Sequence, residues 1–353
     1  MNEVILHLAE QIDKVMTIDL SGRGVADILY ACARERAGGP VAFAAARSIF
    51  EARKKEPGYV FIATGFPDRP QIDRRIAETD GPPGAAALAR ALHLACHAVP
   101  VILVEEDLVP AMTSVMEAAG LRCLDPVQAA SSAHSIAPLH AASVMAFPTG
   151  TEEARRASRE LLSLYEPWAV VCTEKAGMND RGVIHTMRGH DITPYMAKID
   201  YLMMDAGERG VLTIGVGDGG NEIGMGAIQD GVRRSVPYGE KCQCGCGSGV
   251  APATVTESLV VAAVSNWGCY GVAACLAILA GEPRFFHDAA IERAMLEACA
   301  RSSLIDGCTG LVGPSVDGLP AHIHVAVVEM LGQLIATALR CPWRQHDAPD
   351  SPD

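Results

Sequence analysis

Residues 215–226 form the segment whose composition most clearly suggests chemistry. They read Gly-Val-Gly-Asp-Gly-Gly-Asn-Glu-Ile-Gly-Met-Gly, so that Asp218 and Glu222 lie among six glycines. Carboxylate oxygens are the ligands that hard divalent cations such as magnesium or manganese prefer. We therefore expect an oxygen-rich cation pocket, and an active site, around this loop. The plainer alternative is a tight turn between a strand and a helix, with Asp218 capping that helix.

The same loop fits the G-x-G-x-x-G spacing of dinucleotide-binding proteins. In such proteins the pyrophosphate lies at a helix N-terminus, and an acidic residue follows about 20 residues later at the end of a second strand. Here Asp218 lies inside the turn and Glu222 is expected at the start of the helix, so two carboxylates would face the pyrophosphate. No clear second strand ending in an acid follows. We therefore expect no nicotinamide cofactor.

The elements that must position this loop alternate between two types. Short apolar runs rich in β-branched residues predict buried strands at 59–63, 99–104, 169–173, 211–215 and 259–264. Longer amphipathic stretches predict helices at 3–16, 25–37, 41–54, 84–96, 108–119, 152–165, 195–207, 268–280, 289–301 and 320–339. This alternation predicts an α/β fold of three layers, with a mostly parallel sheet and helices on both faces.

Loops that follow the strands are where such sheets bind ligands. The candidate site residues in these loops are Thr64, Gly65, Glu78 and Asp80 after the first strand, Glu174, Arg188 and Asp191 after the third, and Asn266 after the fifth. Structural roles remain open for several of them. Arg188 could be a surface residue, Glu78 and Asp80 could cap the helix beginning near Gly84, and Asn266 could only close a strand.

Composition limits the partners and the location. The formal net charge of −13 repels nucleic acid and anionic membrane surfaces, so we expect neither as a partner. The sequence contains no stretch of about 18 uncharged apolar residues, so no membrane-spanning helix is predicted. The acidic start of the chain resembles neither a signal nor a transit peptide, which predicts a cytoplasmic protein. We expect one α/β domain over 1–345, a flexible tail over 346–353, and a homo-oligomer as one option.

Three of the twelve cysteines, Cys242, Cys244 and Cys246, occupy alternate positions. In an extended segment they would share one face. A zinc site would need a fourth ligand, for which His287 and Cys269 are candidates. The preferred interpretation is a reduced, glycine-rich surface loop, since a cytoplasmic protein keeps its thiols reduced.

Several blocks of the sequence resemble the D-glutamate cyclase family, in the domain that forms the C-terminal half of the longer animal proteins. The glycine loop is similar to that family's signature, and the blocks 64–66, 78–82, 187–192, 264–268 and 316–318 resemble others in the same order. The resemblance spans nearly the whole chain. The animal proteins carry an additional N-terminal domain that this sequence lacks.

The resemblance implies a lyase that converts D-glutamate to 5-oxo-D-proline and water. As hypotheses, Asp218, Glu222 and Glu174 hold a divalent cation that polarises the carboxyl group. Asp80 or Asp191 takes a proton from the amine, and Arg188 grips the other carboxylate. The expected substrate-binding residues are Thr64, Gly65, Glu78, Arg188, Gly219, Gly220, Asn221 and Asn266.

Two other functions remain open. The same carboxylates could serve metal-dependent hydrolysis or phosphoryl transfer on a small acidic metabolite. The protein could also bind such a metabolite without converting it. An assay with D-glutamate, L-glutamate and phosphate esters, with and without manganese, separates the three.

Overall fold

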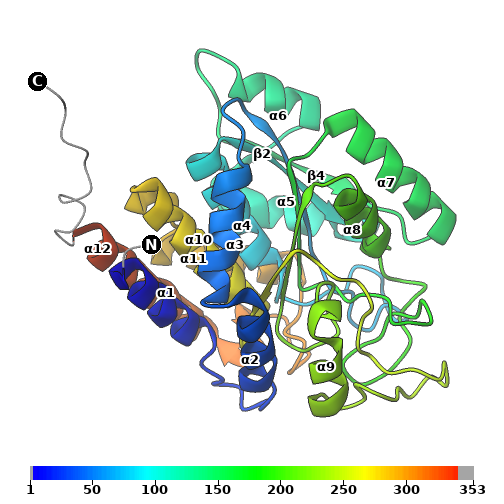
Figure 1. Ribbon diagram of the computed structural model, residues 1–353. Helices are drawn as coiled ribbons and strands as arrows, with labels where there is room; N and C mark the ends of the chain where they lie inside the picture. Colours follow the sequence, from blue (N-terminus) through cyan, green and yellow to red (C-terminus); the bar gives the residue numbers. More distant parts are fainter. Residues whose placement is uncertain (1–2, 341–353) are drawn as a thin grey trace, which may run out of the picture.

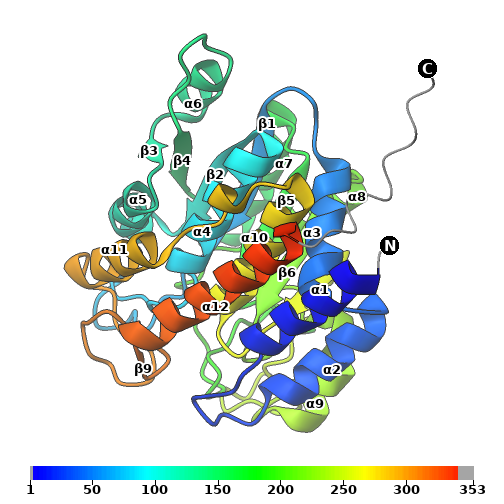
Figure 2. The ribbon, with the colours of Figure 1, turned by 90° about the vertical axis from the view of Figure 1, so that its left-hand side faces the viewer.

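The computed structural model of the protein describes residues 3–340, which form a sheet of seven strands covered by helices on both faces (Figures 1 and 2). Neighbouring strands are parallel throughout, in the order β3-β4-β2-β1-β5-β6-β7. The strands are β1 Gly58–Ala63, β2 Ala98–Val104, β3 Arg122–Cys123, β4 Ala141–Ala146, β5 Ala169–Thr173, β6 Leu212–Gly217 and β7 Ser258–Val261. The predicted three-layer α/β fold is therefore confirmed.

The longer helices lie close to their predicted positions. They are α1 Glu3–Met16, α2 Ala26–Ala37, α3 Val41–Ala52, α4 Pro82–Cys96, α5 Val109–Ala118, α7 Thr151–Tyr165, α8 Ile199–Glu208, α10 Ser265–Ala280, α11 Ala289–Arg301 and α12 Ala321–Arg340. Two short helices were not predicted, α6 Pro126–Ala133 and α9 Gln229–Ser235. Helix α10 begins at Ser265, three residues before its predicted start, so Asn266 belongs to its first turn and does not merely close a strand.

Alternate residues of the strands pack into two separate cores. Phe61, Val101 and Val170 point toward α7 and α8, whereas Ile62 and Ile102 point toward the helices of the opposite layer. Figure 1 shows α7 and α8 on one side of the sheet and α1, α3, α10 and α12 on the other. Because both faces are covered, the strands can be apolar throughout, as in β2, whose seven residues are all buried.

The strand order places a topological switch point at β1 and β5. The chain passes from β1 to β2 on one side, and later resumes at β5 on the other side of β1. The connections that leave β1 and β5 pass to opposite faces of the sheet, through α4 and α8. Ligands bind at such a switch point in sheets of this kind. Thr64 directly follows β1 and Glu174 directly follows β5.

Among residues 3–340, α12 is the one helix long and apolar enough to cross a membrane by length and composition. Glu329 interrupts its apolar run, so the sequence predicted an ordinary helix over 320–339. In the fold, α12 packs against α1, α10 and α11, and Figure 2 shows it alongside α1. The predicted tail at 346–353 lies outside the described residues.

Candidate active site

Buried carboxylates gather beyond the carboxyl ends of the central strands. They are Asp80, Glu174, Asp218, Glu222 and Asp317. Oxygens of Glu174, Asp218 and Glu222 lie within 4.8 Å of one another, and so do oxygens of Asp80, Asp218 and Asp317. Asp218 belongs to both sets, so the two possible cation positions share this residue.

The glycine loop is organised by one of its own carboxylates. The Oε1 atom of Glu222 accepts hydrogen bonds from the backbone N–H groups of Asp218 at 3.2 Å and Gly219 at 2.7 Å. The Oε2 atom accepts one from the N–H of Gly220 at 2.7 Å. The next residue, Asn221, donates its side-chain amide to the carbonyl of His185 at 2.8 Å. Glu222 thus closes the loop upon itself.

The expected position of Glu222 at the start of a helix is wrong. Strand β6 continues to Gly217, and the chain after Glu222 turns through the 3₁₀ helix η2 Gly226–Ile228 before α9 begins. A pyrophosphate would need free backbone N–H groups at a helix N-terminus. Here the carboxylate of Glu222 already takes the amides of the turn, so the geometry of this loop suits a cation better than a dinucleotide.

Asp80 joins the loop after β1 to the start of α10. Its Oδ2 atom accepts a hydrogen bond from the backbone N–H of Ser265 at 2.9 Å, and its Oδ1 atom accepts one from Asn266 at 2.9 Å. These are N–H groups of the first helical turn, which have no partner within the helix. A carboxylate is favourable at this end of the helix dipole. Asp80 is therefore held rigidly at the edge of the carboxylate cluster.

Asn266 ties the same two segments together from the other side. Its side-chain Oδ1 accepts hydrogen bonds from Gly81 at 3.0 Å and Gly84 at 2.7 Å, and its amide donates to the carbonyl of Thr79 at 3.2 Å. The side chain is fully buried. Asn266, predicted as a substrate-binding residue, thus has its polar atoms committed to backbone groups.

Gly81 allows β1 and β5 to bring their loops together. It has a φ of +97°, in the region that favours glycine. A Cβ atom there would lie 2.7 Å from Oγ1 of Thr64 and 2.8 Å from Cβ of Glu174. The buried hydroxyl of Thr64 has no hydrogen-bond partner among the described residues.

Glu174 adopts a left-handed backbone conformation with a φ of +43°. Such a conformation costs about 1 kcal/mol or more for a residue other than glycine, and it occurs often at functional sites. The hydroxyl of Ser265 donates a hydrogen bond to Oε2 of Glu174 at 2.6 Å. The side chain is thereby held between the glycine loop and the start of α10.

Burial raises the pKa values of the clustered carboxyl groups. Burial first, and then the charge of Asp218, raises the pKa of Asp80 to about 8 and that of Glu222 to about 7. The same two causes hold the pKa of Glu174 well above its ordinary value. Burial and the charge of Asp80 do the same for the pKa of Asp317. Charges of one sign in a dry site favour the uptake of protons or of a cation.

Arg23 supplies positive charge to the cluster, and the sequence reasoning missed it. Its guanidinium forms salt bridges with Asp218 and, at 3.1 Å, with Asp317, and it also donates to the carbonyl of Ala263 at 2.6 Å. The loop between α1 and α2 carries Arg23 across the end of the sheet. Two features of the sequence could have indicated this contact. Gly22 and Gly24 flank the arginine, as in a tight loop, and its partner Asp317 lies in the family-like block at 316–318.

Lys175 fixes the loop that follows β1. This fully buried lysine donates to the carbonyls of Thr64 at 3.1 Å and Gly65 at 2.7 Å, and it forms a salt bridge with Glu105 at 2.6 Å. Glu105 also accepts a hydrogen bond from the backbone of Ala197 at 2.7 Å. The loops after β1, β2 and β5 are thus joined through one buried ion pair.

Glu78 lies beside the cluster but outside both sets of three. A Cβ atom on Gly307 would lie 2.6 Å from its carboxyl carbon, so the glycine leaves room for this side chain. Burial, followed by the charge of Asp317, holds the pKa of Glu78 well above its ordinary value. The neutral, protonated form of Glu78 is therefore favoured beside the charged carboxylates.

The structure does not bring Arg188 and Asp191 into the cluster. Both are exposed, on the loop between β5 and α8. Asp191 accepts a hydrogen bond from the backbone of Thr193 at 2.8 Å, and the carbonyl of Arg188 accepts one from Gln243 at 2.9 Å. The neighbouring Met187 covers the glycine loop, since a Cβ atom on Gly219 would lie 3.0 Å from its sulfur.

A cavity of about 550 Å³ opens near the same end of the sheet. Its lining includes Glu105, Arg74, Arg156 and Tyr195, and none of Asp80, Asp218 or Asp317. The carboxylate cluster therefore does not line this cavity.

Comparison with known proteins identifies the family of the chain. The sequence profile of the family described as D-glutamate cyclase-like, C-terminal, matches residues 12–332. The chain is 28% identical over 345 residues to the mitochondrial D-glutamate cyclase of Homo sapiens, an alignment that covers 91% of this chain and 51% of the human protein. It therefore spans about half the length of that relative. The family profile covers nearly all of the described fold, and the chain belongs to the D-glutamate cyclase-like C-terminal family.

Proposed function

We propose that the protein is a lyase that converts D-glutamate to 5-oxo-D-proline and water, with a divalent cation bound at the carboxylate cluster. The observation that carries this proposal is the set of buried carboxylates that share Asp218. The human relative's name supports the choice of substrate. Because the chain spans only half of that relative, the reaction must be tested on this chain itself.

The reaction is an internal condensation. The amine nitrogen attacks the side-chain carboxyl carbon, a C–N bond forms, and a C–O bond of that carboxyl group breaks. Two of the three ammonium protons leave with the departing oxygen as water, so the reaction is balanced without another reactant. Ring closure supplies the proximity of the reacting groups, and the remaining barrier is the protonated amine and the unreactive carboxylate.

A substrate with two carboxylates needs positive charge to bind beside the acidic side chains of the carboxylate cluster. Among residues 3–340, Arg23 is the cation in salt-bridge contact with Asp218 and Asp317. Its side chain is 30% exposed, so it can also reach an incoming carboxylate. Arg188 is exposed on the neighbouring loop and is the second candidate for this role.

The carboxylate cluster has the chemistry of a site for magnesium or manganese. Asp218, Glu222 and Glu174 would hold the ion, as the sequence suggested, with Asp80 and Asp317 forming the adjoining set. The ion would polarise the carboxyl group under attack. The buried hydroxyl of Thr64, which has no hydrogen-bond partner within residues 3–340, lies at the same edge and could donate to a substrate oxygen.

Asp80 is the better supported of the two base candidates. It lies inside the cluster, whereas Asp191 is exposed outside it. A base works best when its pKa is near the working pH, and the pKa of Asp80 is raised to about 8. Asp80 would take a proton from the ammonium group and return it to the departing oxygen.

The test is an assay of purified, metal-free protein with D-glutamate and L-glutamate, with and without added manganese or magnesium. We expect 5-oxo-D-proline to form only when the cation is present. Chromatography on a chiral phase measures this product. A panel of phosphate esters serves as the comparison. Hydrolysis of a phosphate ester in place of cyclisation would reassign the site to hydrolysis, and tight binding of D-glutamate without conversion would reassign it to a binding protein.

A further inference from the structure

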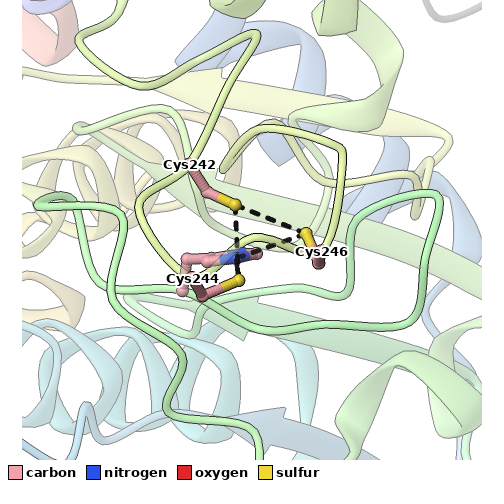
Figure 3. Close-up of side chains that lie close together, drawn as sticks. Cys242, Cys244 and Cys246 are labelled. Carbon is pink, nitrogen blue, oxygen red and sulfur yellow. Dashed lines mark hydrogen bonds between the residues drawn. The ribbon is translucent and has the colours of Figure 1, made fainter.

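The three closely spaced cysteines meet a histidine from a distant loop. Sulfurs of Cys242, Cys244 and Cys246 and a ring nitrogen of His185 all lie within 4.8 Å of one another. Figure 3 shows the three cysteine side chains directed toward one another. The predicted fourth ligands are wrong, because His287 pairs with Glu292 at 3.1 Å and the thiol of Cys269 donates to Thr173 at 3.3 Å.

The distances are those of ligand atoms around a small common centre. The sulfur of Cys242 lies 3.3 Å from that of Cys244 and 3.4 Å from that of Cys246. The Nε2 atom of His185 lies 3.2 Å from the sulfur of Cys244 and 3.9 Å from that of Cys246. A tetrahedral zinc with Zn–S bonds of about 2.3 Å places sulfurs about 3.8 Å apart and the nitrogen about 3.6 Å from each sulfur. A disulfide would instead bring two sulfurs to about 2.05 Å.

The surrounding backbone holds the thiols in this arrangement. The N–H of Cys242 donates to the carbonyl of Ser248 at 2.9 Å, which closes the loop, and Gly245 and Gly247 both have positive φ angles. The buried amide of Asn179 donates to the sulfur of Cys246 at 3.5 Å and to the carbonyl of Gly249 at 2.7 Å. An N–H donor to a ligating sulfur is typical of the outer shell of a metal site.

We propose that Cys242, Cys244, Cys246 and His185 form a structural zinc site. Three sulfurs and one imidazole nitrogen complete a tetrahedron, which is the closed geometry of structural zinc and leaves no position for a substrate. This donor set differs from that of the carboxylate cluster, which suits hard cations. The two groups of side chains therefore suit two different kinds of metal.

The zinc site stabilises the loop that borders the carboxylate cluster. The backbone N–H of Gln243 donates to the carbonyl of Gly189 at 3.0 Å, and its side chain donates to that of Arg188. On the other side, Asn221 of the glycine loop donates to the carbonyl of His185. Loss of zinc should therefore loosen residues 184–191 without removing any carboxylate.

The first experiment uses elemental mass spectrometry to measure the metal content of untagged protein purified without chelator. We expect close to one zinc per chain. The Cys244→Ser and His185→Gln variants should lose most of the zinc, whereas Cys123→Ser, at a cysteine on the distant edge strand, should retain it. Asp218→Asn should also retain zinc, because it changes only the carboxylate site, and this separates the zinc proposal from the proposed function.

A second measurement does not depend on how well the variants fold. Reconstitution of the wild-type protein with cobalt(II) should produce thiolate-to-cobalt charge-transfer absorption, and one equivalent of zinc should abolish it. Two results would overturn the proposal. The first is that reduced wild-type protein neither contains zinc nor takes it up. The second is that two of the three cysteines in the native protein form a disulfide, which would protect them from alkylation until the protein is reduced.

Discussion

The guanidinium of Arg23 forms a salt bridge with the carboxylate of Asp218, although 195 positions separate the two residues. Only 3% of the Asp218 side chain is exposed, and Arg23 reaches it from the loop between α1 and α2. The same guanidinium contacts Asp317. The N-terminal segment thus completes the electrostatics of a site whose carboxylates are spread along the chain from Asp80 to Asp317.

Replacing Arg23 by alanine should destabilise the metal-free protein. The change leaves Asp218 and Asp317 buried without their cation, and removing one partner of a buried ion pair costs about 3–5 kcal/mol. Because Arg23 is partly exposed, we expect the lower end of that range in urea unfolding. Manganese should recover more stability in this variant than in wild type.

A matched control is Arg284→Ala, which removes an exposed arginine paired with Glu282. Its free energy of unfolding should change by less than about 1 kcal/mol. Equal effects of the two substitutions would show that Arg23 does not neutralise the buried carboxylates.

The stability of the metal-free protein should fall as the pH rises from about 4 to 8. Asp80 and Glu222 have ordinary pKa values of 3.8 and 4.5, which the fold raises to about 8 and about 7. Between these values the folded protein holds protons that the unfolded chain has released, so raising the pH favours unfolding. Bound manganese should replace those protons and flatten the dependence.

The measurement is the free energy of unfolding at several pH values, with and without manganese. Asp13 has a raised pKa of about 6 and contributes in the same direction, but only up to that value. From pH 6 to 8 the lowered pKa values of Cys242, about 7, and of His93, His185 and His324 act in the opposite direction. The contribution of Asp80 is therefore read from the difference between wild type and Asp80→Asn, which should have the smaller downward slope. A slope that stays the same in this variant would contradict the assignment.

Lys175→Met should destabilise the protein by about 3–5 kcal/mol, because it leaves Glu105 buried without its partner. The double variant Lys175→Met/Glu105→Gln removes both charges and keeps an oxygen for the N–H of Ala197. It should recover a large part of the loss in a double-mutant cycle. Additive effects of the two substitutions would show that the ion pair has no coupling.

The sequence was sufficient to predict the three layers of the fold and the loops that carry most of the site residues. Buried parallel strands such as β2 are recognisable because burial on both faces selects continuous apolar, β-branched runs. Strand β4 was missed because Ala141–Ala146 is rich in alanine, and only its neighbours β2 and β3 select the extended form. Strand β3 was missed because it has only two residues.

Contacts between distant segments were the part that could not be predicted. No local pattern indicates that Arg23 reaches Asp218, or that His185 meets Cys244, since each contact depends on how two loops cross at the sheet edge. The role of Asn266 depended on where α10 begins, and helix ends are the least certain feature of such predictions. Glu222 was misplaced for the same reason.

Arg188→Ala should weaken the binding of D-glutamate with little effect on stability. Arg188 is exposed, and removing such a side chain changes the free energy of unfolding by about 0.5 kcal/mol or less. Loss of a charge-assisted pair with a substrate carboxylate costs about 1.5–3 kcal/mol, roughly tenfold or more in affinity. Titration calorimetry of this variant checks the prediction, with Arg159→Ala, at an exposed arginine on α7, as the control. Unchanged affinity would leave the role to Arg23.

The most direct test of the carboxylate site uses the Asp218→Asn variant and measures its affinity for manganese and its turnover of D-glutamate. The control is Glu160→Gln, which removes an exposed carboxylate on α7. Asparagine keeps the size of the side chain but is a poorer ligand for a hard cation. We expect Asp218→Asn to remain folded, to bind manganese at least tenfold more weakly, and to lose most of its turnover, while the control matches wild type. Full metal affinity and full turnover in folded Asp218→Asn would contradict the central assignment.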